Sequence, residues 1–222
     1  IGVPLSVWQI QNEDNMGLFE AGISKPDEMH KLERMIQPTI GIFTNIGQAH
    51  DENFESQQAK INEKLKLFTN CSKVIYCKDY LDIHDSIQQP VVSGVELSTP
   101  LTQSTNQSNF FTWSRKSKAD LQIGRIAKQE HETELQGIYK NKFINIRIPF
   151  TDEASIENAI HCWALMLYLD YENEIIAHRM ELLSPVAMRL EMKEGINNCS
   201  IINDSYNSDI GSLTIALDFI NQ

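Results

Sequence analysis

Glu20 and His50 are the residues of this sequence whose types and positions best suit metal chemistry. Each lies just past an apolar, strand-like run, at residues 16–20 and 39–44 respectively. Between these runs, residues 27–36 place apolar side chains at helical spacing, which predicts a helix. Such a strand–helix–strand unit is parallel with a right-handed crossover, and ligands gather at the carboxyl ends of its strands. We therefore expect a carboxylate and an imidazole to converge there, where they could hold a divalent cation beside a phosphate.

Both residues also have a plainer interpretation. A lone acid such as Glu20 is most often a surface or capping residue, although the Ala-Gly that follows it allows a tight turn. His50 could be a structural histidine, since the chain has six. It alone ends the run Thr-Asn-Ile-Gly-x-Ala-His. His161 stands close to Trp163 in a predicted helix, and its expected role is packing.

Lys64 is a third candidate, on a helix predicted for residues 56–68. It shares a side of that helix with Ile61 and Phe68, whereas Lys66 points away. A half-buried lysine loses its charge more easily, because desolvation disfavours the ammonium. A neutral amine can capture carbon dioxide as a carbamate, which would turn Lys64 into an anionic metal ligand. The alternative is a lysine whose stem lies along an apolar stripe with its charge in water, and the residues alone leave the two even.

The other elements follow from hydrophobic pattern and turn chemistry. Residues 79–89 predict a short helix or loop, and residues 86–109 are rich in Gln, Ser, Thr and Pro, which indicates a surface excursion. The four strands between 110 and 148 suggest an antiparallel meander. Thr151 is the expected N-cap of the helix at 151–169. The predicted strands are 73–78, 110–114, 121–127, 132–139, 142–148 and 200–203; the later helices are 151–169, 172–183 and 208–220, the last with Leu213, Ala216, Leu217 and Ile220 inward.

Composition excludes some classes of protein. A length of 222 residues, 41% hydrophobic and 22% charged, is typical of a globular chain with a full core. A formal net charge of −11 argues against a nucleic-acid or anionic-membrane binder. The apolar run at 164–169 is too short for a bilayer. The four cysteines lack zinc spacing, which favours reduced thiols and a cytoplasmic location.

Several motifs together resemble the Mur ligases, the ATP-dependent amide-forming enzymes of peptidoglycan assembly. They comprise Glu-Ala-Gly-Ile-Ser at 20–24, Thr-Asn-Ile-Gly-x-Ala-His at 44–50, Glu-Lys-Leu-Lys at 63–66, Glu-Asn-Ala-Ile-His-Cys-Trp-Ala at 157–164, Met-Arg-Leu-Glu at 188–191 and Asn-Asp-Ser-Tyr-Asn-Ser at 203–208. The resemblance covers most of the chain outside residues 80–145. It implies an α/β fold with a mostly parallel central sheet flanked by helices, of the P-loop ATPase type, with a small antiparallel excursion.

The resemblance also implies roles for individual residues. Glu20 and His50 would hold Mg²⁺, and carbamylated Lys64 would hold a second Mg²⁺, with His50 and Lys64 counted as catalytic. Asn158 would contact the adenine of ATP, although the family's preceding His-Asn pair is Ala-Ser at residues 154–155. Arg189 would reach the nucleotide phosphates. The remaining positions belong to an interdomain segment that closes over ATP: Asp204, Tyr206 and Asn207.

The motif Asp-Ser-Tyr-Asn at 204–207 is most like the family member that adds D-alanyl-D-alanine to UDP-N-acetylmuramoyl-tripeptide. Folate ligases and other Mur ligases usually carry Asp-Tyr-Ala-His there. One alternative is therefore another ligase of the superfamily, and a second is a non-catalytic domain that kept the fold. In some bacteria the resembled ligase is fused to an alanine racemase.

The family's phosphate loop, GxxGK[ST], does not occur in this sequence. In the family that loop precedes the glutamate corresponding to Glu20. We therefore expect residues 1–186 to be a central ATP-binding domain without its phosphate-loop part. Residues 187–222 would begin the C-terminal domain, and the isolated chain would not turn over ATP.

Overall fold

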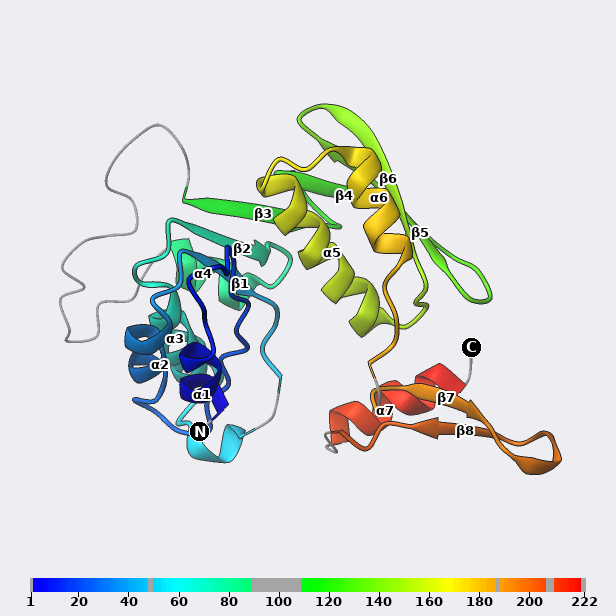
Figure 1. The fold of residues 1–222 in the computed structure, drawn as a ribbon, viewed down its shortest axis with the longest axis horizontal. Helices are drawn as coiled ribbons and strands as arrows, with labels where there is room; N and C mark the ends of the chain where they lie inside the picture. The colour runs from blue at the N-terminus through cyan, green and yellow to red at the C-terminus, as the bar shows by residue number, and fades with distance from the viewer. Residues whose placement is uncertain (1, 48–49, 89–108, 187, 207–209, 221–222) are drawn as a thin grey trace. The chain divides into compact units, whose positions relative to one another are not determined.

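The computed structural model describes residues 2–47, 50–88, 109–186, 188–206 and 210–220 (Figure 1). The fold is mixed α/β, as predicted, with a six-stranded sheet of order β1-β2-β3-β4-β5-β6 and a separate two-stranded sheet, β7-β8. The strands are β1 (Ile40–Phe43), β2 (Lys73–Cys77), β3 (Phe110–Ser114), β4 (Leu121–Lys128), β5 (Thr133–Tyr139), β6 (Lys142–Ile148), β7 (Glu191–Glu194) and β8 (Ser200–Asn203). The α-helices are α1 (Gly2–Trp8), α2 (Met29–Ile36), α3 (Gln57–Leu65), α4 (Leu81–Gln88), α5 (Glu153–Tyr168), α6 (Asn173–Glu181) and α7 (Ile210–Ile220).

The chain divides into two compact units. The first consists of Ile1–Ile46 and His50–Thr112, and the second of Gly47–Ala49 and Trp113–Gln222. The predicted surface excursion falls mostly on residues 89–108, which lie outside the described part of the chain.

The first unit is built on a parallel strand pair joined through α3. Strands β1 and β2 pair with Ile40 opposite Lys73 and Phe43 opposite Tyr76. Their buried side chains and those of α3, the 3₁₀ turn Lys66–Phe68 and α4 form one core, which includes Phe43, Ile61, Phe68, Val74, Tyr76 and Ile83. Gly41 lets the strand approach Phe68, because an added Cβ would fall 2.6 Å from Phe68 Cε1.

The strand predicted at residues 16–20 is wrong. This segment has no regular secondary structure, and Met16 and Leu18 are 64% and 84% exposed. An apolar run becomes a strand only when a neighbour satisfies its backbone hydrogen bonds. The parallel unit is consequently β1–α3–β2, rather than residues 16–20 and 39–44 around α2.

The two helices predicted before β2 are confirmed, and a buried acid connects them. Ser56 is the N-cap of α3, with its Oγ accepting from Ala59 N at 3.1 Å. Glu63 of α3 accepts from the backbone N of Met29 at 3.2 Å and so caps the start of α2. The same carboxylate pairs with Lys66, whose Nζ lies 2.6 Å from Glu63 Oε2.

In the second unit, β4, β5 and β6 form the predicted antiparallel meander, but β3 does not belong to it. β3 pairs in parallel with β4, with Trp113 opposite Leu121. The chain turns directly after β3, where Ser114 Oγ accepts from the backbone N of Lys116 and Ser117. This turn is part of a loop after which the chain runs in its original direction.

Helix α5 begins one residue later than predicted. Its N-cap is Asp152 rather than Thr151, because the Asp152 carboxylate accepts from Ser155 N at 2.8 Å. A carboxylate at this position also interacts favourably with the helix dipole. Trp113 Nε1 donates to Nδ1 of buried His161 at 3.1 Å, which confirms the packing role expected for His161.

The C-terminal residues form β7, β8 and α7. β8 and α7 were predicted, whereas β7 was not; it pairs antiparallel with β8 from Glu191 opposite Asn203. The inward orientation predicted for the stripe of α7 is wrong, since Leu213, Leu217 and Ile220 are 52–62% exposed. Periodicity identifies the apolar side of a helix but does not show whether another element covers it. No described helix is long and apolar enough to cross a bilayer.

Candidate functional site

Lys64 lies half-buried in the last turn of α3. Its pKa is lowered, mainly by desolvation and next by the positive charge of Lys60, while the negative charge of Glu20 opposes the shift. Burial penalises the ammonium, so the neutral amine is favoured. The lowered pKa fits the amine that carbamylation requires, and the influence of Glu20 places its carboxylate within electrostatic range of Lys64.

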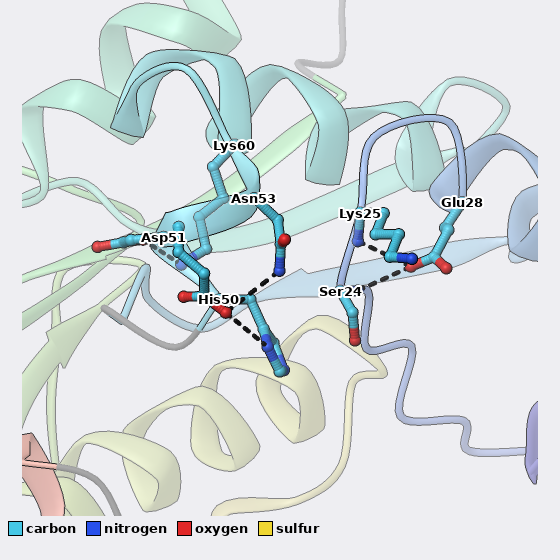
Figure 2. Close-up of polar contacts among 8 residues, drawn as sticks. Ser24, Lys25, Glu28, His50, Asp51, Asn53 and Lys60 are labelled. Atoms are coloured by element: carbon cyan, nitrogen blue, oxygen red, sulfur yellow. Dashed lines mark hydrogen bonds and ion pairs between the residues drawn. The ribbon is translucent and has the colours of Figure 1, made fainter.

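Glu20 is exposed in a segment without regular structure. The backbone that follows it is held by α2, because the N–H groups of Ser24 and Lys25 donate to Glu28 Oε2 at 2.7 and 3.0 Å (Figure 2). These two bonds are the main reason that the pKa of Glu28 is lowered. Glu20 therefore reaches the neighbourhood of Lys64 from an anchored loop and not from a strand end.

His50 opens the 3₁₀ turn Asp51–Asn53 that follows the β1 segment. Its φ is 64°, the left-handed region, and its carbonyl accepts from Asn53 N at 3.0 Å. The side chain is 50% exposed, and its Nδ1 is 3.9 Å from Glu52 Oε1, too far for a hydrogen bond. The imidazole is therefore accessible to a ligand from solvent.

Asp51 and Lys60 are residues that the sequence interpretation missed. Lys60 is 3% exposed, and its Nζ lies 2.6 Å from Asp51 Oδ1. Asp51 is the residue next to His50, and Lys60 is one helical turn before Lys64. The sequence signal for Lys60 is its position four residues before Lys64, because residues four apart on a helix share a face.

The side chains of this region suit an open Mg²⁺ site better than a site in which protein ligands surround the metal. No three His, Cys, Asp or Glu side chains are grouped for metal binding in the ranges that the structure describes. Mg²⁺ commonly keeps several waters and takes only one or two carboxylates together with substrate phosphates. Glu20 supplies a carboxylate of the type that such an open site takes, His50 supplies an accessible imidazole, and a carbamate on Lys64 would add a second anionic ligand.

In the second unit, Asn158 is exposed on α5, whereas the next residues, Ala159 and Ile160, are buried. Its amide is thus available at the surface of the helix. An exposed asparagine is also an ordinary feature of a helix, so position alone assigns it no ligand.

The structure brings Arg189, Asp204 and Tyr206 together. The Arg189 guanidinium lies 4.5 Å from the centroid of the Tyr206 ring. Leu190 N donates to Asp204 Oδ1, and Tyr206 N donates to Met188 O, both at 3.1 Å. These bonds hold a turn in which Met188 and Leu190 both have positive φ. The fourth residue predicted here, Asn207, lies outside the described residues.

Of the predicted site residues that the structure describes, all but Asn158 fall into two local groups. The charge of Glu20 influences the pKa of Lys64 in the first unit, which also holds His50 on the turn that the Asp51–Lys60 ion pair joins to α3. Arg189, Asp204 and Tyr206 form the second group, in the second unit.

Comparison with known proteins places these motifs in a family context. The Mur ligase middle domain matches residues 1–166. The chain is 25% identical to the UDP-N-acetylmuramoyl-tripeptide–D-alanyl-D-alanine ligase of Bacillus subtilis (strain 168), over 98% of this chain and 44% of that protein. It is 23% identical to the ligase of the same name from Rickettsia prowazekii, over 100% of this chain and 47% of that protein. The chain thus spans less than half the length of these relatives.

Solved structures agree on the fold. The crystal structure of MurF from Acinetobacter baumannii matches with a TM-score of 0.80 at 19% identity, covering 100% of this chain and 46% of that one. MurF from Thermotoga maritima, in complex with ADP, matches with a TM-score of 0.66 at 15% identity, over 88% of this chain and 42% of that one. The middle-domain match covers well over half of the sequence, and the chain belongs to the Mur ligase family.

Proposed function

We propose that the protein containing this chain is a cytoplasmic ATP-dependent ligase that joins D-alanyl-D-alanine to UDP-N-acetylmuramoyl-tripeptide. The observation that carries this proposal is the extent of the similarity. Relatives named for that reaction align with 98% and 100% of the chain, and so continue past the middle-domain match, which ends at residue 166. The Asp-Ser-Tyr-Asn motif at 204–207 favours this member over folate ligases.

The proposed reaction has two balanced steps. The terminal carboxylate of the tripeptide attacks the γ-phosphorus of ATP, which gives an acyl phosphate and releases ADP. The amine of D-alanyl-D-alanine then attacks the acyl carbon, loses a proton and expels phosphate, leaving the amide. Phosphoryl transfer of this type depends mainly on positioning and electrostatic stabilisation.

The residues of the first unit would supply that stabilisation. Glu20 and His50 would hold one Mg²⁺, and Lys64, carbamylated, would hold a second. Mg²⁺, when bound, neutralises charge on the transferring phosphoryl group. Support for the role of Lys64 comes from its partial burial and lowered pKa beside Glu20.

The residues of the second unit would bind and enclose the nucleotide. We assign Asn158 to the adenine and Arg189 to the phosphates. Asp204, Tyr206 and Asn207 would belong to the segment that closes over ATP and excludes water from the acyl phosphate. In domain terms, residues 1–186 would be the central ATP-binding domain and residues 187–222 the start of the C-terminal domain.

The test is substrate-dependent phosphate release by the full-length protein. We expect release only when ATP, Mg²⁺, UDP-N-acetylmuramoyl-tripeptide and D-alanyl-D-alanine are all present. Glu20→Gln and His50→Ala should each lower turnover by several orders of magnitude, because a lost charge clamp costs on the order of several kcal/mol and each ~1.4 kcal/mol is tenfold in rate.

The matched controls are Glu13→Gln and His30→Ala, which change the same residue types at exposed positions. Both should keep parental turnover. Release with a folate substrate instead, or no release with any acceptor, would refute the proposed activity. Normal turnover in Glu20→Gln or His50→Ala would refute only the ligand assignment.

A further inference from the structure

Lys60 is a buried cation whose partner lies on a different segment. Its side chain runs from α3 to Asp51, in the turn that His50 begins (Figure 2). Only 3% of the Lys60 side chain is exposed, against 53% for Asp51. The Nζ also lies 6.0 Å from the centroid of the Phe54 ring. Because a buried charge is costly without its counterion, this arrangement draws the turn toward α3.

The turn itself is short and depends on such support. Asn53 N and Phe54 N donate to His50 O and Asp51 O at 3.0 and 3.1 Å. His50 has a positive φ of 64°, a conformation that costs free energy in a residue other than glycine and persists only when its surroundings hold it. Asp51 is the residue after His50, so its ion pair with Lys60 can hold the backbone of His50 in this conformation.

Helix α3 fixes the Lys60 end of the ion pair, because the helix is itself held in the fold. The helix is capped by Ser56 and packed through Ile61, which is fully buried. Lys60 and Lys64 are one turn apart on it, so a displacement of Lys60 relative to the turn is also a displacement of Lys64. The ion pair thus joins the element that carries the imidazole to the element that carries the amine.

We propose that the Asp51–Lys60 ion pair is a strut that sets the position of His50 relative to Lys64, and that Lys60 is a positioning residue of the metal site. The inference rests on the proposed function, because it takes His50 and Lys64 as metal ligands. Lys60 contacts neither nucleotide nor metal in this scheme. It acts through Asp51 on His50.

The test uses the full-length protein with Lys60→Met and Asp51→Asn, alone and combined. Lys60→Met keeps most of the stem and removes the charge. Two quantities are measured: hydrogen exchange of peptides containing the Asn53 and Phe54 amides, and the Kd for Mn²⁺ from the electron paramagnetic resonance signal of the free ion. Lys31→Met is the control for removing an exposed lysine. Ile61→Val is the control for lowering stability without touching the strut.

We expect each single variant to speed exchange in this turn and to raise the Mn²⁺ Kd by about tenfold or more, as residues that orient metal ligands commonly do. The double variant should resemble Lys60→Met, because both lack the buried charge and the ion pair, whereas Asp51→Asn alone should have the larger effect, because it leaves the buried Lys60 ammonium without its counterion. Both controls should keep the parental Kd.

Two results would overturn the strut: exchange at parental rates in both single variants, or a parental Kd in both. Failure of the parental protein to bind Mn²⁺ would instead overturn the metal assignment on which the inference rests. The exchange measurement would then still report whether the ion pair holds the turn.

Discussion

Gly41→Ala should destabilise the first unit by forcing β1 away from Phe68, in the 3₁₀ turn Lys66–Phe68 that follows α3. The new Cβ would fall 2.6 Å from Cε1 of Phe68 and closer still to its Cδ1. Phe68 is only 6% exposed, and its ring lies against Phe43 with 5.9 Å between centroids. The ring therefore has little room to rotate, and either the strand or the helix end must shift.

The expected cost follows from this overlap. Overpacking of a buried site typically costs about 1–3 kcal/mol, and alanine in a strand recovers at most ~1 kcal/mol relative to glycine. A net loss of about 1–2 kcal/mol corresponds to a fall in Tm of roughly 2–8 °C for a chain of this size. The measurement is thermal and urea unfolding, with hydrogen exchange of the β2 amides reporting the first unit.

Gly124→Ala is the matched control, since a Cβ there would meet nothing closer than Gln136 O at 3.9 Å. Its free energy of unfolding should stay within about 0.5 kcal/mol of the parent. Phe68→Leu should relieve part of the Gly41→Ala cost, so that the double variant is more stable than the sum of the single changes. A silent Gly41→Ala, or strict additivity with Phe68→Leu, would refute the steric argument.

Three further predictions concern charged side chains. In the full-length protein, Lys64→Ala should abolish turnover, and formate or acetate should partly restore it by replacing the carbamate oxygens; rescue by a small amine alone would refute the carbamate. Lys66→Met should lower the free energy of unfolding by about 1–2 kcal/mol at pH 7, less than for a fully buried pair because water screens a side chain that is 43% exposed. Bonding to Glu63 raises the pKa of Lys66, so this contribution is present below the ordinary value of 10.5 and disappears as pH rises through the raised pKa; a loss that persists in alkali would contradict this cause. Tyr206→Leu should raise the KM for ATP by releasing Arg189, whereas Tyr206→Phe should not, because the ring alone supports the guanidinium; equal effects of the two would refute the stacking role.

Local sequence determined most of the helices and strands. Helix α3 is encoded by its Ser56 cap and an apolar stripe through Ile61, and β2 by a short β-branched and aromatic run. Each such signal lies within a few residues, so it is readable before the chain is folded. The same holds for the motifs that contain Glu20, His50 and Lys64.

The interpretation failed where a segment depends on a distant partner. Residues 16–20 have the composition of a strand but no strand in the described structure pairs with them. The stripe of α7 was identified correctly as apolar, yet its side chains are exposed. In both cases the sequence shows a propensity, for a strand or for a buried helix face. Whether a neighbouring element pairs with that strand or covers that face depends on the fold.

The sequence by itself therefore determined the family, most of the helices and strands, and the residue types of the candidate site. Only the tertiary structure decided that Glu20 lies in a loop within electrostatic range of Lys64, that Lys60 holds Asp51 beside His50, and that Glu63 caps α2 from 34 positions away. The physical reason is that a cap or a stripe acts over one helical turn. Burial and charge pairing depend on which distant segments pack together. Burial and neighbouring charges in turn set the direction in which the pKa of Lys64 is shifted.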